Sequence, residues 1–110
     1  MTLIDKYVRY ISNIRRYSSR TVDIYCDVLM NYLRVIHKRK DVDDEVLLAS
    51  LNRSEIRQYQ VELLEEGLSS KTVSLHLSAL SSFCRYLMKE GHLKSNPVRL
   101  IVKPKVEKRL

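Results

Sequence analysis

Residues 17–22, Tyr-Ser-Ser-Arg-Thr-Val, return almost unchanged at residues 68–73 as Leu-Ser-Ser-Lys-Thr-Val. Each copy precedes a long segment whose apolar residues have helical spacing, and Ser and Thr are favoured N-caps, so each predicts the start of a helix. Hydroxyl groups, a cation and free backbone N–H groups then meet at the positive end of the helix dipole, where a phosphate can bind. The repeat therefore predicts two helices that begin alike and two sites for an anion. Simple helix capping is the alternative explanation for either copy alone.

The spacing of apolar residues places one helix before the first copy and one after it. The earlier helix covers residues 3–14, with Thr2 as its cap. The later one begins at Ser18 or Ser19 and ends in the basic cluster 37–40, where cations suit the negative end of the dipole. Its predicted buried side consists of Val22, Tyr25, Cys26, Leu29, Leu33 and Ile36.

Two more helices are predicted in the second half of the chain. One is predicted at residues 53–66. Asn52, just before it, forms a capping box with Glu55, and the helix ends before Gly67, where a left-handed residue is favoured. The fourth helix starts at the second copy of the repeat, at Ser69 or Ser70. It ends near Gly91, and its core-facing residues are Val73, Leu77, Leu80, Phe83, Cys84 and Leu87.

The composition favours a single all-α domain. A chain of 110 residues with 45% hydrophobic residues suits one modest core, and two Gly and two Pro supply little of the turn chemistry of a β-rich fold. We expect four helices within residues 1–96, with the acidic stretch 41–45 as a solvated connection that leads into a short turn at 46–49. Residues 97–110 contain prolines and lysines but few apolar residues, so they are expected to begin a basic linker.

Charge is unevenly distributed along the chain, whose formal net charge is +7. Residues 41–66 hold eight acidic side chains against two basic ones, whereas residues 67–110 hold nine basic side chains against two acidic ones. The first 40 residues add a cationic group, notably at residues 15–20 and 38–40. Such polarity favours a nucleic-acid partner, with the middle of the chain facing away from it.

One face of the fourth helix is predicted to meet double-stranded DNA. Steps of three and four residues place Lys71, Leu75, Ser78, Ser82 and Arg85 opposite the core. Small residues in the middle of this face, including Ala79 and Ser81, allow close approach to a major groove, and the cations at its ends can reach flanking phosphates. The alternative is that this Ser/Ala-rich face packs on another helix.

A second predicted contact is the donor-rich corner at the start of the second helix, which would position the protein on phosphates. Tyr10, Tyr17 and Tyr86 are interpreted as half-buried packing residues and are left out of the site. The full set of predicted DNA-binding residues is Arg16, Ser18, Ser19, Arg20, Thr21, Ser70, Lys71, Thr72, Leu75, Ser78, Ser82, Arg85, Lys103 and Lys105.

The sequence favours binding without catalysis. Its three histidines are well separated and lack a carboxylate partner by spacing, and neither metal-ligand spacing nor a Gly-rich phosphate loop occurs, so we expect no catalytic residue, metal or cofactor. Cys26 and Cys84 are expected at core-facing positions and form neither a disulfide framework nor a metal site. No apolar run approaches the ~20 residues of a membrane span. We therefore expect a cytoplasmic protein with no membrane partner and no small-molecule substrate.

A longer pattern resembles a known family. Its elements, in order, are Ser18, Thr21, Tyr25, Ser69, Thr72, Leu77-Ser78-Ala79-Leu80, Phe83, Tyr86-Leu87, Gly91, Asn96-Pro97 and Pro104-Lys105. With this pattern the chain resembles the N-terminal core-binding, SAM-like domain of tyrosine recombinases, which include phage integrases and Xer-type enzymes. The resemblance implies a four-helix orthogonal bundle that forms half of a clamp around duplex DNA at a recombination site, with the second and fourth helices facing the major groove.

The resemblance also implies two protein partners. One is a C-terminal catalytic domain of the same parent chain, which would follow the linker and hold the catalytic residues; none of these is assigned to this sequence. The other is a set of recombinase protomers, which form a tetramer on DNA. The family often has arginines where this chain has His76 and Ser81, so the isolated module is expected to bind phosphates weakly. A helical protein-interaction module and a helix-turn-helix transcription regulator stay open as alternatives.

Overall fold

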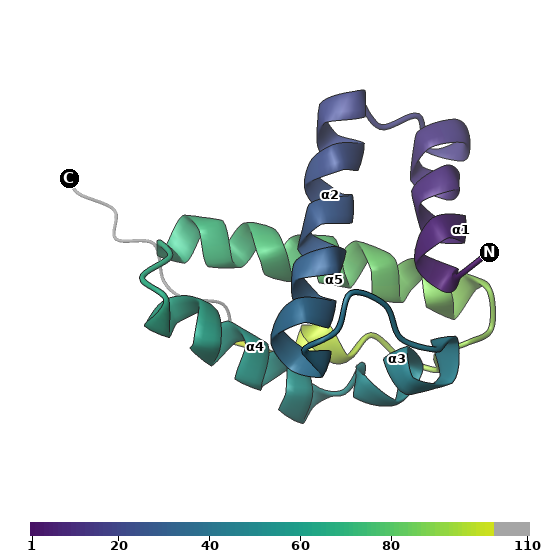
Figure 1. The fold of residues 1–110 in the computed structure, drawn as a ribbon. Helices are drawn as coiled ribbons and strands as arrows, with labels where there is room; N and C mark the ends of the chain where they lie inside the picture. Colours follow the sequence, from purple (N-terminus) through teal and green to yellow (C-terminus); the bar gives the residue numbers. More distant parts are fainter. Residues whose placement is uncertain (103–110) are drawn as a thin grey trace.

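The computed structural model describes residues 1–102, which form five α-helices and no strand (Figure 1). The α-helices are α1 Leu3–Arg9, α2 Ser19–Tyr32, α3 Asp44–Ser50, α4 Arg53–Glu65 and α5 Ser70–Lys89. The first two continue directly into π-helical turns, η1 Tyr10–Ile14 and η2 Leu33–His37, and a short 3-10 helix, η3 Pro97–Leu100, follows α5. The all-α class is confirmed, and the four predicted helices correspond to α1 with η1, α2 with η2, α4 and α5.

The longest helix, α5, is the element around which the others pack. Figure 1 shows α1 and α2 side by side, both running across α5, while α4 leads into α5 through a tight turn. α2, α4 and η3 all contact α5. The centre of the core is correspondingly rich in fully buried side chains of α5, namely Val73, Leu77, Ala79, Leu80, Phe83, Cys84 and Leu87.

The helix ends follow the signals that the sequence contains. The Thr2 hydroxyl accepts a hydrogen bond from the Asp5 N–H while the Asp5 carboxylate accepts one from the Thr2 N–H, which caps α1. At the start of α4, Asn52 Oδ1 accepts from the Glu55 N–H at 2.9 Å. Gly67, with a φ of +89°, takes the left-handed conformation that was expected after α4.

The prediction for residues 41–49 holds for the connection at 41–43 but was wrong from Asp44 on, because α3 forms there in place of a solvated segment and a short turn. Leu47 of α3 and the next apolar residue, Leu51, are both buried. Asp44 Oδ1 accepts a hydrogen bond from the Leu3 N–H at 3.1 Å. This bond satisfies one of the free N–H groups at the start of α1, so a carboxylate that was expected in solvent helps to hold the fold.

The buried side of α2 is broader than the predicted stripe. Leu29 is buried as expected, but Cys26 is only half-buried, and Tyr32, which lay outside the stripe, is buried. The ring of Tyr32 lies 5.0 Å from that of Tyr59 on α4, and its hydroxyl donates to the Ser50 carbonyl. Because α2 with η2 contacts α1, α4 and α5, a single stripe cannot describe its buried surface.

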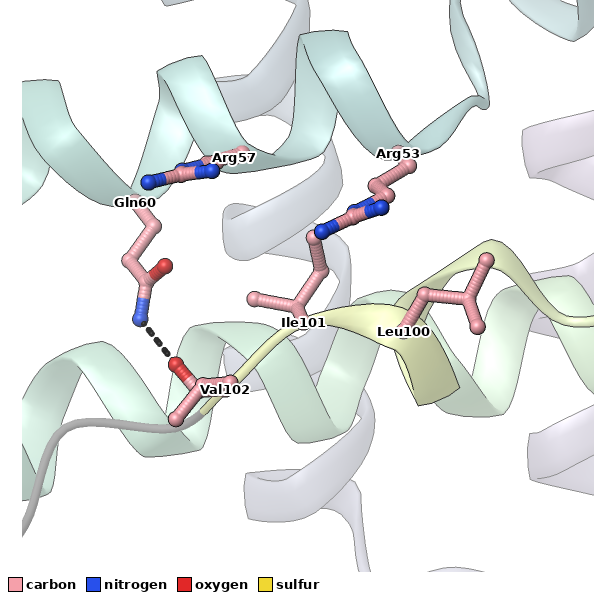
Figure 2. A pocket seen from close by; sticks show the side chains of 6 residues that line it. All are labelled: Arg53, Arg57, Gln60, Leu100, Ile101 and Val102. Carbon is pink, nitrogen blue, oxygen red and sulfur yellow. Dashed lines mark hydrogen bonds between the residues drawn. The ribbon is translucent and has the colours of Figure 1, made fainter.

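The segment after α5 packs against the helices. The linker was expected to begin after residue 96, but Asn96 Oδ1 accepts from the Val98 N–H at the start of η3, and Asn96 Nδ2 donates to Ser81 Oγ of α5. Figure 2 shows residues 100–102 running beside α4, where Gln60 Nε2 donates to the Val102 carbonyl at 2.9 Å. Folded contacts therefore continue beyond residue 96, while the assignment of residues 97–110 to a linker stays a prediction.

Candidate nucleic-acid interface

The two copies of the repeat adopt the same geometry at the starts of α2 and α5. Ser18 Oγ accepts from the Thr21 N–H at 3.2 Å and donates to Thr21 Oγ1 at 3.0 Å. Ser69 Oγ makes the same two bonds with Thr72, at the same two distances. Capping satisfies one N–H of each first turn, and the two preceding N–H groups have no acceptor within the helix. The structure thus confirms two helices that begin alike, and an anion at each start stays a prediction.

The two helix starts lie at different ends of the molecule. In Figure 1, α2 begins at the top of the view, beside the end of η1. α5 begins at the left, at the turn that follows α4. They cannot converge on one anion. Any phosphates that bind them must belong to separate points of an extended ligand.

The exposed face of α5 agrees in outline with the predicted one. Lys71 and Arg85, at its two ends, are exposed, and Leu75 is 41% exposed between them. Ser70, Thr72, Ser78 and Ser82 are half-buried along the same helix. The face thus presents cations at its ends and small or apolar side chains in its middle.

Part of the predicted small-residue surface is used inside the fold. Ala79 is fully buried, so its placement on the DNA-facing side was wrong. Ser82 Oγ accepts a 2.7 Å hydrogen bond from the Tyr7 hydroxyl of α1, and Ser81 Oγ accepts from Asn96 at 2.8 Å. The alternative explanation, that this Ser/Ala-rich surface packs on another element, therefore holds at its two edges, where α1 and η3 flank α5.

The predicted corner is an exposed turn between η1 and α2. Arg16 adopts a left-handed conformation with a φ of +53°, which is uncommon for a residue other than Gly and reverses the chain here. The side chains of Arg16, Ser18, Ser19 and Arg20 are exposed, and Thr21 is half-buried. This turn places two predicted cations beside the free N–H groups of α2.

A hollow of about 190 Å³ joins this corner to the C-terminal half of α5. Three cations line it: Arg15 from the corner, and Arg85 and Lys89 from α5. Lys89 Nζ lies 5.0 Å from the centre of the Tyr10 ring, and the Arg15 guanidinium lies 5.9 Å from that of Tyr17. Cation–π contacts of this kind fix the side chains without neutralising their charge.

The residues that line this hollow were only partly predicted. Arg85 and Ser82 belonged to the predicted site, whereas Lys89 did not, although it lies one helical step of four residues beyond Arg85. Tyr10, Tyr17 and Tyr86 also line the hollow. They pack as expected, with Tyr10 and Tyr86 rings 4.9 Å apart and Tyr17 edge-on to Tyr25.

Two of the predicted DNA-binding residues, Lys103 and Lys105, lie outside the described residues. Across residues 1–102, no group of three or more His, Cys, Asp or Glu side chains is placed to hold a metal ion. In the same part of the chain, no helix has both the length and the apolar character that crossing a membrane requires. Cys84 is fully buried, and burial raises the pKa of its thiol to about 12.

Residues 4–91 match the family described as phage integrase, N-terminal SAM-like domain. The chain belongs to this family. It is 30% identical over 109 residues to the tyrosine recombinase XerC of Bacillus pumilus, an alignment that covers 98% of the chain and 34% of that protein. XerC of Pelotomaculum thermopropionicum is 31% identical and aligns with 97% of the chain and 35% of its own length.

XerC of Bacillus subtilis is also 31% identical, with 94% of the chain and 33% of that protein aligned. The chain thus spans about a third of the length of these curated relatives. No solved structure matches it. The family and these relatives place the chain with the N-terminal SAM-like domain of tyrosine recombinases.

Proposed function

We propose that the chain is the DNA-binding part of a site-specific tyrosine recombinase and that it holds duplex DNA with α5 and the η1–α2 corner. The observation that carries this proposal is the hollow that Arg15, Arg85 and Lys89 line, because these cations come from the corner and from α5. No acidic residue lines the hollow. Arginine and lysine in such a place suit the oxygens of a phosphodiester.

The rest of α5 supports contact with a groove rather than with a single anion. The face between Lys71 and Arg85 carries half-buried serines and the exposed Leu75, which leave the helix backbone accessible to a base-pair edge. Cations at both ends would hold the helix on flanking phosphates, and the side chains between them would meet the bases. The start of α2, with the N–H donors that its cap leaves free, would bind a separate phosphate.

The activity of the complete enzyme is part of the same proposal. The relatives are named tyrosine recombinases, and this chain aligns with about a third of each. We propose that strand breaking and rejoining belong to a C-terminal catalytic domain of the parent chain. DNA and further protomers, as a tetramer on DNA, would then be the partners of this domain in the cytoplasm.

Duplex binding at a series of salt concentrations tests the proposed function. If Arg15, Arg85 and Lys89 each contact one phosphate, the logarithm of the association constant should fall with the logarithm of the salt concentration. The slope should be about −3 or steeper. Fluorescence anisotropy of a labelled short duplex would measure it. The result that contradicts the proposal is absence of binding at low salt, together with a dimer that persists at moderate salt in analytical ultracentrifugation. That outcome favours the helical protein-interaction module.

A further inference from the structure

Four polar side chains form a continuous hydrogen-bonded chain across three helices. Both Nε and Nη2 of Arg34, in η2, donate to Asn31 Oδ1 of α2, at 3.2 and 2.6 Å. Asn31 Nδ2 donates to the Tyr59 hydroxyl of α4 at 2.8 Å. The Tyr59 hydroxyl lies 2.8 Å from His76 Nδ1 of α5. We call these four residues the relay.

The hydrogen bonds of the relay can be assigned one direction. The Tyr59 hydroxyl oxygen accepts from Asn31, and we assign its single hydrogen to His76 Nδ1, because the hydroxyl then donates one bond and accepts one. His76 is then neutral, with its own hydrogen on Nε2. Burial lowers the pKa of His76 and raises that of Tyr59 to about 12, so both groups favour these protonation states near neutral pH.

This arrangement fixes an arginine that lies on the surface. An exposed arginine usually samples many rotamers, but Arg34 is held by two bonds to one amide oxygen, and that amide is held by a fully buried tyrosine. Its acceptor is a neutral amide and not a carboxylate, and the acidic group that acts on the pKa of Tyr59 and His76 is Glu66. Three of the five guanidinium N–H donors remain for another acceptor.

The position of the relay connects Arg34 to the N-terminal half of α5. His76 lies one helical turn after Thr72, in the N-terminal half of α5, whereas the hollow with Arg85 and Lys89 lies at the C-terminal half. The hydrogen bonds of the relay therefore connect Arg34 to the N-terminal half of α5, which also contains Lys71 and the capped helix start. A preoriented guanidinium there loses little conformational entropy when it binds an anion.

We propose that Arg34 contacts a DNA phosphate and that Asn31, Tyr59 and His76 are positioning residues that hold its guanidinium in the binding conformation. This inference rests on the proposed DNA-binding function. It adds to the interface a cation from the end of α2 that sequence reasoning did not include in the site.

The contact itself is tested by Arg34→Ala with Arg39→Ala as its matched control. Both arginines line one open depression at the end of α2, but only Arg34 belongs to the relay. Arg34→Ala should weaken binding to a short mixed-sequence duplex about tenfold. It should also make the salt slope shallower by about 0.9. Arg39→Ala should change both quantities much less.

The positioning role is tested by Tyr59→Phe with Tyr32→Phe as its control. Both tyrosines are almost fully buried. Tyr59→Phe removes the two hydroxyl hydrogen bonds of the relay, with Asn31 and His76, whereas Tyr32→Phe removes one bond, to the Ser50 carbonyl outside the relay. Tyr59→Phe should weaken binding about threefold while leaving the salt slope unchanged, because the charge remains and only its ordering is lost. Nitrogen chemical shifts of His76 should show one tautomer, protonated on Nε2, in the unmodified chain and a mixture in Tyr59→Phe.

Each alternative result overturns a defined part of this inference. If the unmodified chain binds duplex DNA in a salt-sensitive way but Arg34→Ala binds with the same affinity and slope, Arg34 does not contact DNA and the proposed function still stands. If Tyr59→Phe matches Tyr32→Phe in affinity, with both folded by circular dichroism, the relay does not position Arg34. If the unmodified chain does not bind duplex DNA at any salt concentration, the proposed function and this inference both fail.

Discussion

Simultaneous reversal of two charges on α5, Lys71→Glu with Arg85→Glu, is expected to weaken duplex binding by at least about a hundredfold at low salt. Both side chains are exposed at opposite ends of the face proposed to meet the groove. On the proposed interface, each reversal would remove a charge-assisted hydrogen bond to a phosphate and add a repulsive carboxylate. Fluorescence anisotropy gives the affinity, and circular dichroism checks that the variant is folded.

The matched control is Arg53→Glu with Arg57→Glu on α4. This pair changes the net charge by the same amount, and its side chains line a separate pocket of about 180 Å³ beside residues 100–102 (Figure 2). Because this part of the chain is otherwise acidic, it should face away from the duplex. Its reversal should therefore weaken binding far less. Equal losses in the two double variants would mean that only the net charge matters and that α5 has no special place on DNA.

The replacement Tyr7→Ala should remove about 3–5 kcal/mol from the free energy of unfolding. Tyr7 is fully buried, and its ring meets Phe83 edge-on at 5.1 Å and lies 5.6 Å from Tyr86. Its hydroxyl donates to Ser82 Oγ at 2.7 Å, so one side chain fixes α1 on the C-terminal half of α5. A domain of ordinary stability has about 5–15 kcal/mol in total, so this variant should be close to unfolding.

Urea unfolding followed by circular dichroism measures this loss. Tyr7→Phe serves as the graded control, because it keeps the ring and removes only the hydrogen bond to Ser82, which should cost about 1 kcal/mol. A Tyr7→Ala variant as stable as Tyr7→Phe would contradict the assigned packing of α1 on α5. If Tyr7→Ala folds but binds DNA poorly, the hollow between η1 and α5 depends on this anchor.

The parts of the fold that were correctly predicted depend on short stretches of sequence. The caps at Thr2, Asn52 and the two copies of the repeat, and the left-handed Gly67, require only neighbouring residues. Apolar spacing likewise located α1, α4 and α5. Local backbone hydrogen bonding is therefore sufficient to define where most of these helices begin and end.

The wrong predictions share a different cause, which is contact with residues far away in the sequence. α3 is held by Asp44 bonding to Leu3, and the buried side of α2 depends on Tyr32 meeting Tyr59. Ala79 is buried, although residue spacing placed it near the exposed face. None of these contacts has a local signal, because each depends on how the helices cross.

The residues of the candidate site also divide into those that local sequence spacing predicts and those that depend on how the helices pack. Exposure of Lys71, Leu75 and Arg85 followed from the helical period alone. The hollow that adds Arg15 and Lys89, and the relay that ends at Arg34, arise only when separate helices are brought together. Lys89 was still within reach of sequence reasoning, since extending the predicted face by one turn includes it.

Amide chemical-shift mapping of this chain, titrated with a short duplex, tests most directly whether DNA binds where we propose. We predict that the largest changes occur at residues 15–21, at residues 70–72 and along the exposed face of α5 to Lys89, with a further change at Arg34. The exposed side of α4 around Arg53 and Arg57 should change little. Changes confined to α3 and α4, with α5 and the η1–α2 corner unaffected, would contradict the proposed interface.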